Sequence, residues 1–114
     1  MMLENSWFKE IPVTITVCNA EGMILAMNER ARKYFAKEGG KELIGKNLLD
    51  CHPPAARKKI EEMLEKQTSN YYTIQKEGKK KFIYQTPWYQ EGIFMGITEM
   101  IFEVPPEIPN FVRK

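Results

Sequence analysis

The sequence is poor in the residues that build metal and redox sites. Its 114 residues include two cysteines, Cys18 and Cys51, and a single histidine, His52. The cysteines form no CxxC pair and no spacing typical of a metal site. We therefore expect no metal centre and a reducing compartment, which predicts a cytoplasmic location.

Long apolar runs and catalytic motifs are also missing. No stretch reaches the ~18 apolar residues of a membrane span, and the N-terminus, which carries Glu4, has no apolar core of a signal peptide. The formal net charge of +2 is too small to indicate nucleic acid or a membrane as a partner. Without a phosphate loop or a carboxylate–histidine–nucleophile trio, the sequence predicts a non-enzymatic protein.

What is present is the composition of one globular domain, with 43% hydrophobic and 28% charged residues. The alternating, β-branched stretch Val13–Cys18 predicts a strand. A turn through Gly22 leads to a second strand, Met23–Met27. Asn28 can then cap a helix over Glu29–Ala36. The first third of the chain is thus a hairpin followed by a helix.

The stretch Leu43–Leu64 leads into the best-marked helix of the chain. Before it, Lys41–Leu49 is irregular or one short helix. Pro53 suits the first helical position because its φ is already helical, and His52 suits the N-cap. One apolar stripe follows at helical spacing: Ala56, Ile60, Met63 and Leu64.

The last third of the chain predicts a meander of three strands. The strands are expected over Asn70–Lys76, Lys79–Tyr89 and Ile93–Val104, with tight turns at Glu77-Gly78 and Glu91-Gly92. The order of elements is then β-β-α-α-α-β-β-β. It predicts an α+β fold, a five-stranded antiparallel sheet with helices packed on one face.

This order of elements resembles a PAS domain. Val13–Asn28 looks like the opening PAS hairpin, Ile44–Leu49 followed by His52-Pro53 like the loop before the long helix, and Asn70–Val104 like the closing meander. The resemblance predicts a leader over 1–11, a PAS-like domain over 12–106 and a tail over 107–114. The stretch Asp50–Ala55 departs from the Asn-Cys-Arg-Phe-Leu-Gln of the flavin-binding LOV subgroup, so no flavin adduct is expected.

The resemblance implies a sensory or signal-transduction module, including modules that regulate transcription, which binds a small molecule or a partner protein. The identity of any cofactor stays open. One alternative is a haem-type gas or redox sensor that uses His52 as the ligand, because neutral imidazole is a good nitrogen donor. Another is a ligand-free interaction or dimerisation module. His52 is first expected to cap a helix, while Cys51 beside a helix N-terminus is a redox or ligand candidate.

The predicted ligand pocket lies between the sheet and the helices. Its polar handle is expected to be a tyrosine hydroxyl, since pockets are mostly apolar with a few placed polar groups. The expected lining residues, besides Cys51 and His52, are Ile15, Val17, Leu25, Tyr34, Phe35, Leu48, Ile60, Met63, Leu64, Tyr72, Ile74, Tyr84, Phe94 and Met100.

The last strand is apolar on both faces apart from Thr98 and Glu99, whereas a sheet covered on one side should have a polar outer face. We therefore predict a symmetric homodimer through the outer face. Its expected interface is Trp7, Phe8, Ile93, Met95, Ile97 and Ile101. The alternative is a monomer whose leader and tail fold over this face.

Overall fold

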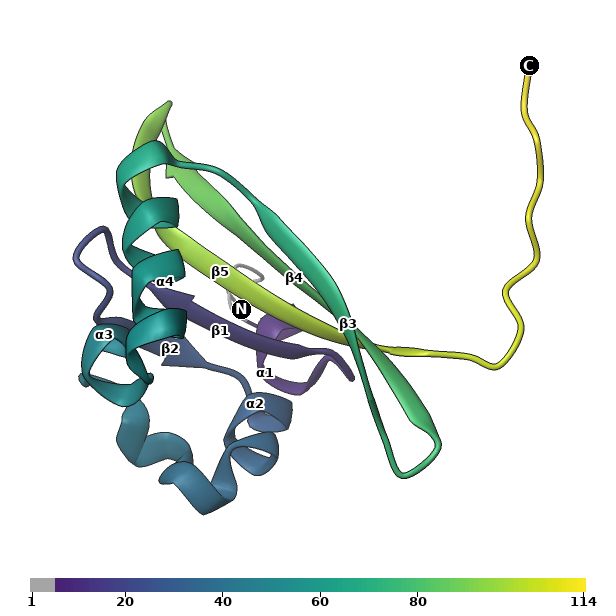
Figure 1. Ribbon diagram of the computed structural model, residues 1–114, viewed down its shortest axis with the longest axis horizontal. Coiled ribbons are helices and arrows are strands. Elements are labelled where there is room, and N and C mark those ends of the chain that lie inside the picture. The colour runs from purple at the N-terminus through teal and green to yellow at the C-terminus, as the bar shows by residue number, and fades with distance from the viewer. Residues whose placement is uncertain (1–5) are drawn as a thin grey trace.

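The computed structural model describes residues 6–114 and confirms the predicted fold class. Five strands form one antiparallel sheet in the order β2-β1-β5-β4-β3. They are β1 (Thr14–Cys18), β2 (Ile24–Met27), β3 (Asn70–Lys76), β4 (Lys79–Gln90) and β5 (Ile93–Val104). Helices α2 (Glu29–Tyr34), α3 (Leu48–Cys51) and α4 (Pro54–Lys66) lie over one face of this sheet (Figure 1).

Asn28 joins the first hairpin to α2. Its side-chain oxygen accepts hydrogen bonds from the backbone N–H groups of Ala31, at 3.0 Å, and Ile15, at 3.1 Å. Its amide nitrogen donates to the carbonyl of Val13 at 2.7 Å. One buried side chain therefore caps the helix, as predicted, and also ties the helix start to β1.

The start of α4 differs from the prediction by one residue. Pro54 opens the helix and Pro53 occupies the N-cap, whereas His52 follows the last residue of α3. The His52 ring is held there because its Nδ1 donates to the carbonyl of Leu48 at 2.8 Å. His52 therefore satisfies the carbonyl of Leu48, the first residue of α3, instead of capping α4.

Two short 3-10 helices, η1 (Ala36–Glu38) and η2 (Gly40–Leu43), complete the helical segment between α2 and α3. The predicted helix over Glu29–Ala36 thus ends two residues early, at Tyr34. The meander strands begin where the sequence predicts, and the turn residues Glu77 and Gly78 both have positive φ, as a tight hairpin requires.

The predicted leader and the predicted tail lie differently relative to the domain. Of the predicted leader, residues 1–5 lie outside the described part, and α1 (Ser6–Glu10) contacts α2. The predicted tail contains no helix or strand and extends away from the domain (Figure 1). The arrangement in which the tail folds over the outer face of the sheet is therefore not the one observed.

Gly96 on β5 leaves room for a side chain of β4 to reach across β5 and contact the backbone of β1. A Cβ at this position, where φ is 148°, would collide with the backbone carbonyl of Cys18. The indole nitrogen of Trp88, which pairs with Gly96 in register, donates to that same carbonyl at 3.0 Å. Glycine is thus required here for close packing on the outer face of the sheet.

Candidate functional site

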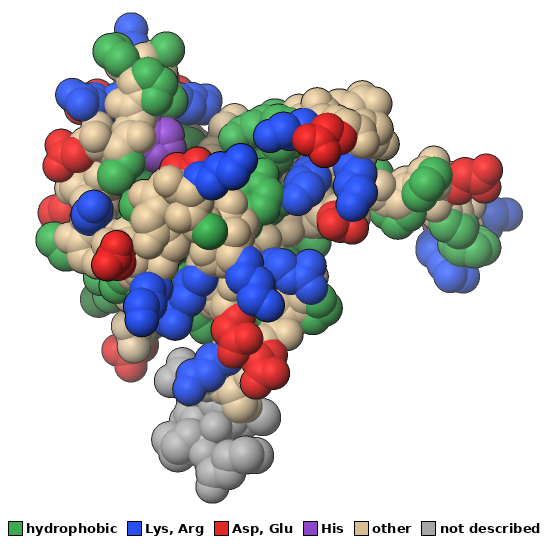
Figure 2. All heavy atoms as spheres, turned by 90° about the horizontal axis from the view of Figure 1, so that it is seen from below, with side chains coloured by type: hydrophobic (Ala, Val, Ile, Leu, Met, Phe, Trp, Pro, Cys, Tyr) green, Lys and Arg blue, Asp and Glu red, His purple; other side chains and the backbone are tan. Residues whose placement is uncertain are grey.

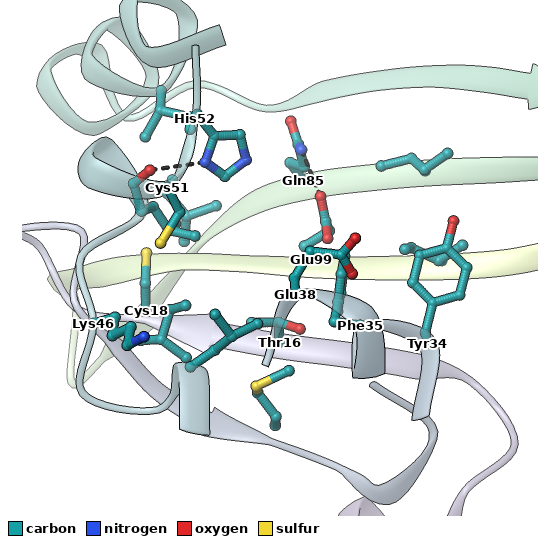
Figure 3. A pocket seen from close by; sticks show the side chains of 18 of the residues that line it. Thr16, Cys18, Tyr34, Phe35, Glu38, Lys46, Cys51, His52, Gln85 and Glu99 are labelled. Carbon is teal, nitrogen blue, oxygen red and sulfur yellow. Dashed lines mark hydrogen bonds between the residues drawn. The ribbon is translucent and has the colours of Figure 1, made fainter. Parts of the chain in front are cut away.

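A cavity of about 600 Å³ lies between the helix-facing side of the sheet and the helices. This volume is in the range of small-molecule sites. The sheet contributes the floor, and α2, α3 and α4 contribute the remaining walls (Figure 3). Most of the lining is apolar: Ile24, Met27, Phe35, Leu43, Leu48, Ile60, Met63, Ile74, Ile83, Ile97 and Ile101.

A row of polar side chains crosses the floor of the cavity. Four residues stand opposite one another in register on adjacent strands, and we call them the polar row: Thr16 on β1, Glu99 on β5, Gln85 on β4 and Asn70 on β3. Asn70 donates to Gln85 Oε1 at 3.0 Å, and Gln85 Nε2 donates to Glu99 Oε2 at 2.7 Å. The row thus fixes the orientation of the Gln85 amide toward Glu99 (Figure 3).

Glu99 is the charged group of this floor. Removal of the carboxyl group from water raises its pKa above the ordinary value for glutamate. The hydrogen bond from Gln85 and the nearby His52 act in the opposite direction but are smaller effects. The carboxyl group therefore gains a proton more readily than an exposed glutamate does.

Thr16 is the other end of the row and the unsatisfied member. Only 9% of the residue is exposed, and among residues 6–114 its hydroxyl is the only buried side-chain polar group without a hydrogen-bond partner. Such groups are rare in folded proteins and cost free energy. The hydroxyl itself is almost fully covered, so the unused hydrogen-bonding capacity that faces the cavity is that of Glu99.

His52, Cys51 and Cys18 form one end of the cavity. The His52 ring points toward Gln85 and Glu99 (Figure 3). Because its Nδ1 donates to Leu48, Nε2 is left with a lone pair when the ring is neutral. Cys51 is the last residue of α3, two residues before the N-cap of α4, and is exposed. Burial raises the pKa of the Cys18 thiol.

The cavity opens to solvent beside β3. Tyr34, Tyr72 and Ile74 line it and are also substantially exposed, so they mark its mouth. Burial of the Tyr72 hydroxyl raises its pKa, and the charge of Glu99 adds to this effect. Figure 2, which views the molecule from below, shows Lys and Arg side chains gathered on the same outer side of the molecule as α2 and the 3-10 helices.

More than half of the residues predicted for the pocket line the cavity. These are Tyr34, Phe35, Leu48, Cys51, His52, Ile60, Met63, Tyr72 and Ile74. Phe94 and Leu64 do not line it but pack beside it, against the cluster of Cys18, Met63 and Ile97.

The remaining predicted residues were assigned to the wrong face: Ile15, Val17, Leu25, Tyr84 and Met100. On β1, β4 and β5 the alternation holds, but in the phase opposite to the predicted one. Thr16, Cys18, Ile83, Gln85 and Glu99 therefore face the cavity. The sequence reasoning missed the polar row, although Glu99 was the charged exception in an apolar strand and could have been its signal.

The predicted dimer interface is also partly wrong. Ile97 and Ile101 are each only 6% exposed and line the cavity, so they cannot form an outer face. Of the other predicted interface residues, Trp7 and Ile93 are exposed, and Phe8 and Met95 are half-buried. The outer face instead carries an aromatic stripe, in which neighbouring ring centroids lie 6.3–6.5 Å apart: Tyr71, Tyr84, Phe82 and Phe102.

Over residues 6–114 no group of three or more His, Cys, Asp or Glu side chains is placed to hold a metal ion. In the same range, no helix has the length and apolar character to cross a membrane.

The sheet order, the helices on one face and the cavity between them define an α+β domain of the PAS type. The family model of the PAS fold matches residues 8–92, so the chain belongs to this family. PAS domains are in general sensory modules without catalytic activity. No curated protein matches the sequence.

Solved structures share the fold. The C-terminal domain of a protein from Streptococcus mutans has 24% identity and a TM-score of 0.71, over 90% of this chain and 83% of that one. The VqmA dimer of Vibrio cholerae, described as a LuxR-type receptor, has 16% identity and a TM-score of 0.68, over 93% and 54%. The Aer2 receptor of Vibrio cholerae, described as a dual PAS-haem oxygen sensor, has 13% identity and a TM-score of 0.59, over 82% and 95%.

Proposed function

We propose that this chain is a sensory signal-transduction module that binds a small molecule in the cavity between sheet and helices. The observation that carries this proposal is an apolar cavity of about 600 Å³ whose floor holds a carboxyl group with an unused hydrogen-bond acceptor. Such a combination suits ligand binding better than core packing, in which buried polar groups are normally paired. Its membership of the PAS family supports the sensory role.

The module is proposed to act in the cytoplasm, without catalysis, through a partner protein. Regulation of transcription is one output, supported by the fold shared with VqmA. Its extent is proposed as 12–106, flanked by the leader 1–11 and the tail 107–114. A single strand can carry the signal from the ligand to the partner protein. On β5, Glu99 faces the cavity and the adjacent Met100 faces the other side of the sheet.

A thermal-shift screen of a metabolite library tests the binding site. Ile74→Trp enlarges a side chain at the cavity mouth, and Tyr71→Trp makes a similar change on the opposite face of the same strand. Compounds that stabilise the wild type should lose their effect in Ile74→Trp and keep it in Tyr71→Trp. Equal effects in all three proteins, or no stabilising compound at all, would contradict the proposal.

Haem sensing is a second candidate, favoured by one observation. His52 points into the cavity with Nδ1 bonded to a carbonyl, which leaves Nε2 as the metal-ligating atom. In this case haem would be held by His52 and would supply binding of a gas or a redox change. Titration with haemin should then give a Soret band that shifts in His52→Ala but not in Cys51→Ala. Identical spectra for all three proteins would exclude it.

Homodimerisation through the outer face is proposed as the arrangement in which the module works. The aromatic stripe is the supporting observation, since Tyr71 is 66% exposed and isolated apolar stripes mark interfaces. If the cavity binds no ligand, dimerisation alone would be the function of the module. Sedimentation at micromolar concentration should show a dimer that Tyr71→Lys dissociates and Tyr72→Lys, on the cavity side, does not. A monomeric wild type would exclude it.

A further inference from the structure

Within residues 6–114, the carboxyl group of Glu99 forms no ion pair. Among residues 6–114, the one ion pair closer than 4.0 Å joins Lys59 and Glu62 on the surface of α4. Glu99 accepts one hydrogen bond, from the neutral amide of Gln85, and this bond uses only Oε2. A carboxylate withdrawn from water is costly unless it is paired, so Glu99 lacks a counter-ion.

Hydrogen bonds between neighbouring strands of the sheet orient the side chain of Glu99. Asn70 donates to the Gln85 carbonyl, so the Gln85 amide can only present its N–H groups to Glu99. Glu99 Oε1 makes no hydrogen bond within the described part of the chain, and the residue lines the cavity. Opposite it in register, the unpaired hydroxyl of Thr16 belongs to the same floor.

The other ionisable groups that line the cavity do not act as counter-ions for Glu99. Lys46 and Glu38 line the cavity but are exposed, and neither forms an ion pair within residues 6–114. Charges on the outer surface, including the Lys and Arg side chains seen in Figure 2, are screened by solvent. His52 lies within electrostatic reach of Glu99 without contacting it. Of the carboxylates that line the cavity, Glu99 is therefore the one that is withdrawn from water.

We propose that the ligand is a small organic cation, an apolar ring-sized body with a protonated amine that donates to Glu99. This inference rests on the proposed function, because it assumes that the cavity binds a ligand. The amine supplies the missing counter-ion and a charge-assisted hydrogen bond to Oε1, while the apolar walls hold the body. Charge-assisted hydrogen bonds are about twice as strong as neutral ones, so the amine end decides selectivity.

Three probes with the same ring test this inference: tryptamine, with a cationic end, 3-ethylindole, with an uncharged end, and indole-3-propionate, with an anionic end. Their affinities are measured by NMR titration of the ¹⁵N-labelled protein. We expect tryptamine to bind about tenfold more tightly than 3-ethylindole, and indole-3-propionate to bind most weakly. In Glu99→Gln the preference for tryptamine should vanish, while the affinity for 3-ethylindole stays unchanged and shows that the cavity is intact.

Glu38→Gln is the matched control, because Glu38 is an exposed carboxylate that lines the same cavity. It should keep the preference for tryptamine. If 3-ethylindole binds but the wild type shows no preference for tryptamine, or if Glu99→Gln retains that preference, the inference is wrong and cavity binding stands. If none of the three probes binds, the inference fails, and the thermal-shift screen decides the proposed function separately.

Discussion

Glu99 is the residue on which both the site and the stability of the protein depend. Its pKa is raised in the folded state because the carboxyl group is withdrawn from water. A raised pKa means that folding favours the protonated form. The stability contributed by this group is complete below the ordinary carboxyl pKa and is lost as the pH rises through the raised pKa.

The first prediction follows from the raised pKa of Glu99. Glu99→Gln removes the titration and keeps the shape, so the variant should become more stable than the wild type as the pH rises from 4 to 8. At the acid end the two proteins should have nearly equal free energies of unfolding, measured by urea denaturation. His52 and Tyr72 face the same region, but both proteins contain them. A difference that shrinks as the pH rises would contradict the account.

Thr16 carries the second prediction. Thr16→Val keeps the branched shape and removes a buried hydroxyl that has no partner. The free energy of unfolding of the ligand-free protein should therefore rise by about 1 kcal/mol. Thr98→Val is the control, because Thr98 is equally buried as a residue but its hydroxyl is not an unsatisfied buried group. A loss of stability in Thr16→Val would show that the hydroxyl has a partner in solution.

At this scale the sequence predicted the helical side of the cavity better than its floor. Tyr34, Leu48, Ile60 and Met63 were assigned correctly, because helical spacing places one apolar stripe toward the core. The strands were harder, since both of their faces are apolar and period-2 alternation then has two equally good solutions. On β1 the prediction placed the more hydrophobic Ile15 in the cavity, whereas the neighbouring Thr16 lines it.

Among the elements, the hairpin and α2 depend on one side chain. Asn28 is 1% exposed and makes three hydrogen bonds that join α2 to β1. The sequence predicted its role as a cap because Asn precedes an apolar-periodic segment. The bonds to β1 could not be predicted, because they depend on how the hairpin lies against the helix.

The third prediction concerns this side chain. Asn28→Ala leaves two buried N–H groups and one carbonyl without partners, so it should cost roughly 2–4 kcal/mol of the free energy of unfolding. Asn28→Asp retains the acceptor for both N–H groups, and in its protonated form it can also donate to Val13, so at acid pH its cost should be smaller. Equal losses in the two variants, measured by denaturant unfolding at acid pH, would contradict the dual role.

The bounds of the strands were predicted closely and those of the helices less so. Tight turns with glycine fix the ends of the meander strands locally, which makes them readable from sequence. By contrast, the start of α4 shifts from Pro53 to Pro54 because His52 is held by Leu48. Either proline suits a first helical turn, and the sequence alone does not show that His52 turns back to bond with Leu48.

At the scale of the whole molecule, the chain is a PAS-family domain whose two sheet faces are proposed to have different tasks. The helix-facing side carries the polar row in an apolar cavity, and the outer side carries the aromatic stripe. The order of elements was enough to predict the family fold. The separation of tasks was not, because strands that are apolar on both faces fit either phase of the alternation, and only packing against the helices decides which side chains face inward.

The fourth prediction is also the most direct measurement of the central claim, that the cavity binds a small molecule. It is a crystal structure of the protein with the compound that gives the largest thermal shift. Our account predicts electron density for the compound between the sheet and α4, in contact with Glu99. Density for the compound on the outer face alone, with Met63 and Ile60 closing the cavity, would contradict it.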